Sequence, residues 1–178
     1  MSAAAITGGR VTLQNVIPEH ISPTFNAFLE AGCEIKQGED YLELTAPKRL
    51  NRISQTKTLV YPGFPTDAQA PLMAITTKAK GTSVFIETIF ESRYKHVDQL
   101  RRMGANIKIE QRVAIVEGVE RLYGTTVTAT DLRGGAALVV AGLSAYGKTK
   151  IYDTFHIDRG YEDIEHNLLK IGANIKRI

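Results

Sequence analysis

A short pattern that occurs three times, at intervals of about 70 residues, limits the fold of this chain more than any other feature. In each copy a glycine follows a segment with helical character and precedes a short stretch that ends in isoleucine. The copies are Ala31-Gly32-Cys33-Glu34-Ile35, Met103-Gly104-Ala105-Asn106-Ile107 and Ile171-Gly172-Ala173-Asn174-Ile175. Glycine at this place allows the left-handed backbone that often ends a helix. We therefore predict helices over residues 22–31, 94–103 and 161–171, followed by strands over 34–36, 107–110 and 175–178.

A second pattern lies between these copies and also repeats. Thr66-Asp67-Ala68-Gln69 and Thr130-Asp131-Leu132-Arg133 each precede a segment rich in small residues. These segments predict helices that end near Gly81 and Gly147, with strands over 84–87 and 150–153. The small residues along them indicate close helix–helix packing inside a core. Residues 2–9 match the end of such a helix, and a strand is expected over 11–15.

Together the two patterns predict three copies of one β-α-β-α-β-β unit. The first copy lacks its beginning and the third lacks its end. We therefore expect one α/β domain over residues 1–178, with pseudo-threefold symmetry, paired helices facing a common centre and small sheets outside. Because two units are incomplete, we also expect the natural protein to be longer than this chain.

The composition favours a soluble cytoplasmic protein with an anionic ligand. Of 178 residues, 43% are hydrophobic and 23% are charged, as in ordinary globular proteins. No stretch approaches the roughly 20 apolar residues of a membrane span, and no basic-then-apolar leader opens the chain. The net charge of +3 suits an anion. Without a dense Lys/Arg run or an aromatic stacking platform, nucleic acid is not an expected partner.

The single cysteine, Cys33, excludes an intrachain disulfide framework. It follows Ala31-Gly32 at a predicted helix end, which favours a buried structural thiol over a nucleophile. The histidines show no metal-ligand spacing with it, so we expect no metal site. Each histidine is interpreted as a surface or capping residue; the four are His20, His96, His156 and His166.

The loop over residues 61–65 contains two prolines and one glycine, so it must have a defined shape. It follows an apolar run over residues 58–61 that we interpret as the end of a strand. It closes on Thr66-Asp67, where the helix begins. Asp67 is therefore either an ordinary N-cap or a carboxylate presented for chemistry, or both. Its counterpart Asp131 is interpreted as a cap or as a residue that orients an arginine.

Three arginines occupy comparable junctions between strands and helices. Residues 87–93 align without a gap with residues 153–159, and each segment runs from an acid and a threonine to an arginine. Arg133 lies two residues beyond Asp131. Guanidinium groups beside helix N-termini can clamp a carboxylate or a phosphate. Alternatively, Arg93, Arg133 and Arg159 pair with neighbouring acids as part of the scaffold, the candidates being Glu91, Asp131 and Asp158.

Four segments resemble the UDP-N-acetylglucosamine 1-carboxyvinyltransferases, the enolpyruvyl transferases that open peptidoglycan synthesis. The segments are residues 61–70, 87–97, 130–133 and 156–162. They occur in the right order over essentially the whole chain, but they cover only the C-terminal half of that enzyme. The resemblance implies an inside-out α/β barrel of three units, paired in the full enzyme with a second such domain across an active-site cleft.

The resemblance also implies a reaction and a role for each site residue. The enolpyruvyl group of phosphoenolpyruvate moves to the 3-hydroxyl of UDP-N-acetylglucosamine through a tetrahedral intermediate that loses phosphate, without metal or organic cofactor. Asp67 would contact that hydroxyl and act as general base. Ile89 would contact the nucleotide sugar through its backbone, with Phe90 beside it. The phosphoenolpyruvate side of the cleft would be lined by Arg93, Arg133 and Arg159, with Asp131 among them.

The reactive cysteine of this family lies on a mobile loop of the other domain, with a lysine and further arginines that this chain lacks. We therefore expect the chain to hold half of an active site and to be inactive alone. The expected partners are the two substrates, the N-terminal domain of the same enzyme, and other copies through the exposed inter-domain face.

Two alternatives to this interpretation stay open. One is the related enolpyruvyl transferase of the shikimate pathway, although residues 62–67 and 158–162 argue against it. The other is a binding or scaffold domain without chemistry. In that case Asp67 and the three arginines would be satisfied internally instead of facing one open surface.

Overall fold

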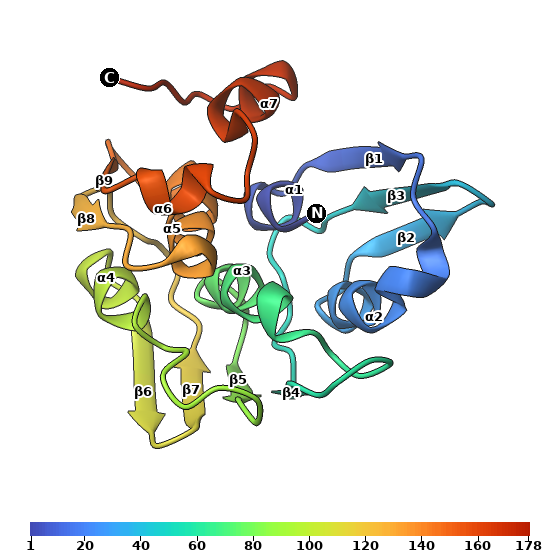
Figure 1. Ribbon diagram of the computed structural model, residues 1–178, viewed down its shortest axis with the longest axis horizontal. Helices are drawn as coiled ribbons and strands as arrows, with labels where there is room; N and C mark the ends of the chain where they lie inside the picture. Colours follow the sequence, from blue (N-terminus) through green and yellow to red (C-terminus); the bar gives the residue numbers. More distant parts are fainter.

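The computed structural model describes all 178 residues and places three small sheets around three central helices (Figure 1). The central helices are α1 (Ser2–Thr7), α3 (Thr66–Thr76) and α5 (Leu132–Ser144), and each packs against the other two. The chain therefore has a mixed α/β fold whose helices form the middle and whose sheets lie toward the outside. None of the helices combines the length and apolar character needed to cross a lipid bilayer.

The three sheets show the same strand pattern in different states of completeness. The first has the order β1-β3-β2, built from β1 (Arg10–Gln14), β3 (Tyr41–Thr45) and β2 (Glu34–Gln37). The second has the order β4-β5-β7-β6, from β4 (Gln55–Lys57), β5 (Thr82–Ile86), β7 (Val113–Glu117) and β6 (Asn106–Glu110). The third contains only β8 (Thr126–Thr128) and β9 (Lys150–Tyr152).

The pairing within the sheets agrees with the predicted repeat. The parallel pair β4–β5 recurs as β8–β9, and the antiparallel arrangement of β5, β7 and β6 recurs in β1, β3 and β2. The second unit thus contains all its strands. The first unit has no strand before α1, and the third has none after its last helix.

Further helices link the strands. They are η1 (Pro18–Ile21), α2 (Ser22–Glu30), α4 (Val97–Arg102), α6 (Phe155–Asp158) and α7 (Ile164–Lys170). Two of them, α2 and α4, bury side chains in the main core. Gly32, Gly104 and Gly172 follow α2, α4 and α7 with φ angles of 90°, 93° and 93°. The predicted left-handed helix ends are confirmed at all three positions.

Close packing of α3 against α5 forms the centre of the main core, which contains 33 buried hydrophobic residues. Both helices are buried over most of their length because small residues let the backbones approach. Gly135 shows how tight the fit of α5 is, since a Cβ atom there would lie 2.6 Å from Ile157 of α6. The prediction that these helices are core elements is confirmed.

Several sequence predictions were wrong. The apolar run over 58–61 is not a strand end: β4 stops at Lys57, and residues 59 and 60 are exposed. The helices expected from residues 94 and 161 begin only at Val97 and Ile164. Residues 175–178 form no strand, because β9 has no further neighbour with which they could pair. His96 is the N-cap residue of α4, one of the two roles expected for it, but it is fully buried against the start of α5 and its side chain makes no capping hydrogen bond.

Candidate active site

One cavity of about 400 Å³ collects most of the residues singled out from the sequence. It lies where the first turns of α3 and α5 meet the segments that follow β5 and β9. Its lining residues are Asp67, Arg93, Thr130, Asp131, Leu132, Arg133, His156 and Arg159. Five predicted site residues, from the second and third units, are therefore brought together. Ile89 and Phe90 do not line this cavity.

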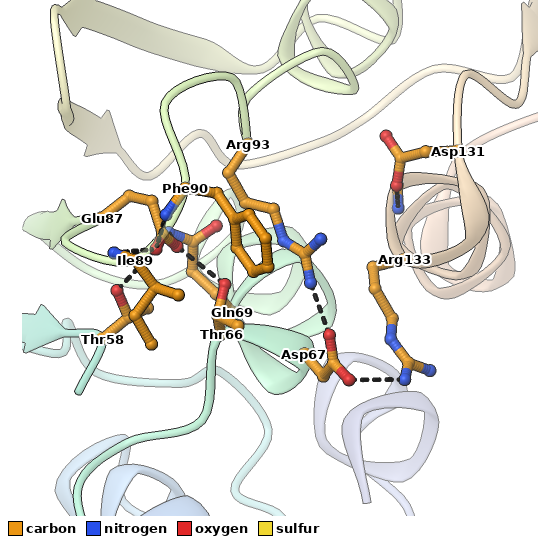
Figure 2. A network of polar contacts seen from close by, with 11 residues as sticks. Thr58, Thr66, Asp67, Gln69, Glu87, Ile89, Phe90, Arg93, Asp131 and Arg133 are labelled. Atoms are coloured by element: carbon orange, nitrogen blue, oxygen red, sulfur yellow. Dashed lines mark hydrogen bonds and ion pairs between the residues drawn. The ribbon is translucent and has the colours of Figure 1, made fainter. Parts of the chain in front are cut away.

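Asp67 bridges two of the arginines (Figure 2). Arg93 Nη2 donates to one carboxylate oxygen at 2.5 Å, and Arg133 Nη2 donates to the other at 2.7 Å. The Asp67 side chain is 55% exposed, so the pair of guanidinium groups holds a carboxylate that is open to solvent. A ligand in the cavity would reach the carboxylate and both guanidinium groups at once.

The expected N-cap role of Asp67 was wrong. Helix α3 is capped at Pro65, so Thr66 and Asp67 are its first two residues, and no backbone N–H donates to the Asp67 side chain. Asp131 in the homologous Thr-Asp pair is a true N-cap, since its Oδ1 accepts from the Gly134 N–H at 2.8 Å. The helix therefore starts earlier relative to the aspartate in the second unit, and this shift releases Asp67 from the cap.

The three arginines do not pair with the neighbouring acids that the scaffold alternative names. Glu91 lies 3.6 Å from Arg112, and Asp158 pairs with Arg177 at 2.7 Å. Asp131 caps α5 instead of binding an arginine. Arg159 is exposed and makes no ion pair. The scaffold alternative in that form is wrong, while the anion clamp stays a prediction.

An aromatic ring contacts each of the two guanidinium groups that bind Asp67. The Arg93 guanidinium lies 4.9 Å from the centre of the Phe90 ring, and the Arg133 guanidinium lies 5.8 Å from that of Tyr161. Such contacts favour a cation over the face of a ring. Arg93 Nε is buried without a hydrogen-bond partner. Both guanidinium groups are thus supported on one side and directed toward Asp67 on the other.

The electrostatics of the cavity favour an anion. Three arginines face two carboxylates, and one of these carboxylates is occupied by its own helix N-terminus. The hydrogen bond from Arg133, together with the charges of Arg133 and Arg93, holds the pKa of Asp67 below its usual value despite partial desolvation. Asp67 is therefore ionised at neutral pH and can accept a proton only weakly while both arginines hold it.

Glu87, for which no sequence pattern predicted a role, accepts more hydrogen bonds than any other acid of the region. Glu87 follows β5, is 1% exposed and accepts five hydrogen bonds (Figure 2). The donors are the Thr58, Thr66 and Gln69 side chains and the backbone N–H groups of Ile89 and Phe90. The one sequence feature that could have indicated a role for Glu87 is its place at the start of the alignment between residues 87–93 and 153–159.

The pKa of Glu87 is set by two opposed effects. Burial, the largest contribution, raises it, but the N–H groups of Phe90 and Ile89 and the two threonine hydroxyls more than offset this, so that the pKa lies below its usual value. The carboxylate is thus charged without an ion-pair partner. Burial and the nearby Glu87 charge raise the pKa of Tyr94 to about 12, which keeps that phenol a neutral donor.

Ile89 and Phe90 lie on the loop after Glu87 and are 40% and 48% exposed. This loop is joined to the end of β4, because the Thr88 N–H donates to Thr58 Oγ1 at 2.9 Å. Exposed Leu59, Val60 and Tyr61 follow the same threonine. The loop after Glu87 and the segment after Thr58 therefore both present exposed apolar side chains near the helix that carries Asp67.

Three further residues of the cavity were not predicted as site residues. They are Thr130, Leu132 and His156; the first two adjoin Asp131 in the sequence, and His156 precedes Arg159 by three residues. Cys33 is buried elsewhere, as expected, and burial raises its pKa to about 11. No three His, Cys, Asp or Glu side chains are grouped closely enough to hold a metal ion.

Comparison with known proteins gives the class to which this fold and site belong. Residues 1–168 match the family model of EPSP synthase (3-phosphoshikimate 1-carboxyvinyltransferase). The enolpyruvyl transferase NikO from Streptomyces tendae superposes with a TM-score of 0.87 at 24% identity, covering 98% of this chain and 42% of that one. EPSP synthase from Acinetobacter baumannii superposes with a TM-score of 0.63 at 18% identity, covering 90% of this chain and 42% of that one. These likenesses show the fold of the 1-carboxyvinyltransferases.

Sequence relatives narrow the class further. The chain is 53% identical over 177 residues to the UDP-N-acetylglucosamine 1-carboxyvinyltransferase of Desulfofundulus thermocisternus, covering 99% of this chain and 72% of the relative. It is 50% identical over 177 residues to UDP-N-acetylglucosamine 1-carboxyvinyltransferase 2 from Clostridium acetobutylicum, and the match covers 99% of this chain and 42% of the relative. The chain belongs to the 1-carboxyvinyltransferase family, on the branch of the UDP-N-acetylglucosamine enzymes. It spans about 42% of the length of several of these relatives.

Proposed function

We propose that this chain is one domain of a UDP-N-acetylglucosamine enolpyruvyl transferase and supplies one wall of its active site. The observation that carries the proposal is Asp67 held between Arg93 and Arg133 at the mouth of a cationic cavity. The names of the relatives at about half identity supply the substrate class.

The proposed chemistry divides the work between these groups. Asp67 takes the proton of the sugar 3-hydroxyl while the hydroxyl oxygen adds to C2 of phosphoenolpyruvate, and C3 takes up a proton from the solvent. The tetrahedral intermediate then expels phosphate from C2 as C3 releases a proton to the solvent, which forms the enol ether double bond of the product. Fixed guanidinium groups suit this reaction because charge must be held on a carboxylate and on a phosphate throughout. No step requires a metal ion or an organic cofactor.

The bridged state of Asp67 bears on how such a site works. A phosphate or carboxylate in the cavity competes with Asp67 for Arg93 and Arg133. As these arginines turn to the ligand, the pKa of Asp67 rises toward its ordinary value, and the carboxylate becomes a better base. The substrate anion thus prepares the group that accepts the proton.

The remaining parts of the proposal follow from the family relationship. Ile89 contacts the nucleotide sugar through its backbone, with Phe90 beside it, and Arg159 and Asp131 complete the phosphoenolpyruvate side. The domain is an inside-out α/β barrel whose exposed face meets the N-terminal domain of the same enzyme, or a second copy when that domain is absent. The enzyme acts in the cytoplasm on peptidoglycan precursors, which connects it with cell shape and division.

Two measurements on the purified chain test the proposal. We expect weak binding of UDP-N-acetylglucosamine, seen as shifts of the Ile89 and Phe90 amide signals, and no binding of shikimate 3-phosphate. Preference for shikimate 3-phosphate would favour the shikimate-pathway enzyme, and binding of neither would favour a scaffold domain. We also expect no phosphate release from phosphoenolpyruvate and UDP-N-acetylglucosamine; turnover by the chain alone would refute its role as half of a site.

A chimaera tests the positive part of the same proposal. In it, this chain replaces its matching segment in the Clostridium acetobutylicum relative, with which it is 50% identical over 177 residues. We expect the chimaera to release phosphate with both substrates present and to lose that activity on Arg133→Ala. A folded chimaera without activity would contradict the proposal.

A further inference from the structure

The three equivalent strands β1, β5 and β9 are each followed directly by a polar residue, and only one of these residues is buried. Asn15 after β1 and Asp153 after β9 are exposed, and both have a φ angle of 56°. Glu87 after β5 has no positive φ and is 1% exposed. No side-chain hydrogen bond involves Asn15 or Asp153, whereas Glu87 accepts five. The repeated fold therefore does not itself require a buried acid here.

Each oxygen of Glu87 holds a different part of the site (Figure 2). Oε1 accepts from the Ile89 N–H at 2.8 Å, from the Phe90 N–H at 3.1 Å and from Thr58 Oγ1 at 2.9 Å. Oε2 accepts from Thr66 Oγ1 at 2.9 Å and from Gln69 Nε2 at 3.2 Å, both in the first turns of α3. One carboxylate thus joins the loop after β5 to the helix start that carries Asp67.

These links determine how the site groups lie relative to one another. Thr66 precedes Asp67, and Phe90 supports the guanidinium of Arg93, which binds Asp67. Because Glu87 uses the N–H of Ile89 and no hydrogen bond reaches the Ile89 carbonyl, the carbonyl is the backbone group that this residue offers to a ligand. Of the two units that contain a Thr-Asp pair, the third uses its aspartate to cap the helix and the second does not.

We propose that Glu87 is a positioning residue that holds the Ile89–Phe90 loop against the start of α3, so that the Ile89 carbonyl and the Asp67 carboxylate face the same sugar nucleotide. This inference rests on the proposed function. Glu87 touches no reacting atom itself. It acts through the five donors that it orders, and the cost of burying its charge is offset only while those donors stay in place.

The test compares two substitutions that differ in what they leave behind. Glu87→Ala leaves the backbone N–H groups of Ile89 and Phe90 without an acceptor, so the loop must move to hydrate them. Glu87→Gln keeps one acceptor oxygen for those groups. Its amide can donate to Gln69 Oε1, which is buried without a partner, once the Gln69 amide turns over. The glutamine variant should therefore preserve the loop, as the alanine variant cannot.

Leu44→Ala serves as the control for stability, because Leu44 is fully buried in β3 of the first sheet and does not line the cavity. For each variant we would measure the melting temperature, the exchange rates of the Ile89 and Phe90 amides, and UDP-N-acetylglucosamine affinity by NMR titration. We expect Glu87→Ala to weaken binding about tenfold or more and to speed exchange of both amides. Glu87→Gln and Leu44→Ala should both bind UDP-N-acetylglucosamine with the affinity of the unchanged chain. Leu44→Ala should nevertheless lower the melting temperature about as much as Glu87→Ala does.

The outcomes separate this inference from the function on which it rests. If Glu87→Ala binds the sugar nucleotide as Leu44→Ala does, or if its two amides exchange no faster, the positioning role is refuted and the proposed function stands. If Glu87→Gln weakens binding as much as Glu87→Ala, the effect belongs to the charge and not to the ordered loop. If the unchanged chain binds no UDP-N-acetylglucosamine, the proposed function itself fails.

Discussion

At the scale of single residues, identical dipeptides take different roles in the two units. Thr66-Asp67 and Thr130-Asp131 both stand at the start of a core helix, but only Asp131 caps its helix. The N-cap of α3 is Pro65, two residues before Asp67, whereas Asp131 is itself the N-cap of α5. An aspartate released from its cap can bind two arginines, and this is the arrangement that the candidate site depends on.

The charge of Asp67 is expected to matter more for activity than for folding. In the chimaera, Asp67→Asn removes the proton acceptor and should lower the rate of phosphate release by about 10²–10⁴-fold, the usual contribution of general acid–base catalysis. A phosphate-release assay measures this. Asp98→Asn is the control, since Asp98 forms only an exposed ion pair with Arg101 on α4. Equal activity of the two variants would contradict the assignment of Asp67 as base.

His96 should make the stability of the chain depend on pH. Burial, with the Arg93 charge, lowers the pKa of His96 to about 4, although the Asp131 charge acts in the opposite direction. The native state therefore binds fewer protons at this histidine than the unfolded state between pH 6.5 and 4, so stability is full above this window and falls as the pH is lowered through it. The slope from one such group is at most about 1.4 kcal/mol per pH unit.

Urea unfolding at several pH values between 7 and 4 measures this dependence. His96→Leu should flatten it in the upper part of the window, because exposed carboxylates titrate mainly below pH 5. His166→Leu is a control on the partly exposed α7. An unchanged pH dependence in His96→Leu would show that other groups cause the loss of stability.

At the scale of elements, α3 and α5 link the core to the site. Their middles pack in the main core, and their first turns carry Asp67, Asp131 and Arg133 to the cavity. Because the helices are held along their length, the carboxylate and guanidinium groups at their N-termini are placed by the packing of small residues. The glycines of α5 therefore affect the geometry of the site from within the core.

Two glycines of α5 should respond oppositely to the same substitution. In Gly135→Ala the new Cβ would lie 2.6 Å from Ile157 Cγ1, so overpacking should cost about 1–3 kcal/mol. In Gly142→Ala the nearest atoms, in Thr149, are 3.4 Å away, and alanine should stabilise the helix by about 0.5–1 kcal/mol. Chemical denaturation of both variants measures the difference. A loss of the same size in both would show that the α5 to α6 contact is not the cause.

At the scale of the whole molecule, the cavity lies between parts of the second and third units. Asp67 and Arg93 come from one and Arg133 and Arg159 from the other, so an anion in the cavity should hold the units together. Binding to the native state alone stabilises a protein by RT ln(1 + [L]/Kd), which is about 2.7 kcal/mol at a ligand concentration of 100 Kd.

Inorganic phosphate should therefore raise the melting temperature of the chain. The rise should be absent in Arg133→Ala and retained in Arg52→Ala, whose arginine lies beside Gly81, outside the cavity. Chloride at matched ionic strength controls for screening. A rise of equal size in Arg133→Ala, or with chloride, would mean that the arginines form no anion site.

Much of the architecture could be predicted from the sequence because the chain repeats itself. Recurring glycines such as Gly104 mark helix ends through a local backbone preference, and small residues mark the core helices through their pattern. Five of the predicted site residues also proved to line one cavity, since each lies at an equivalent junction of the repeated unit. These features depend on neighbours close in sequence or on comparison between copies.

Only the tertiary structure decided what depends on partners far away in the chain. It placed Asp67 between Arg93 and Arg133, although Arg133 is separated from it by 66 residues. It buried Glu87 while leaving Asp153, its aligned counterpart, exposed. It also left residues 175–178 without a strand, because no neighbouring strand is there to accept their hydrogen bonds. Local sequence determined the repeated units and the glycines that end their outer helices, whereas hydrogen bonds and ion pairs to distant residues determined which of the repeated acids belong to the site.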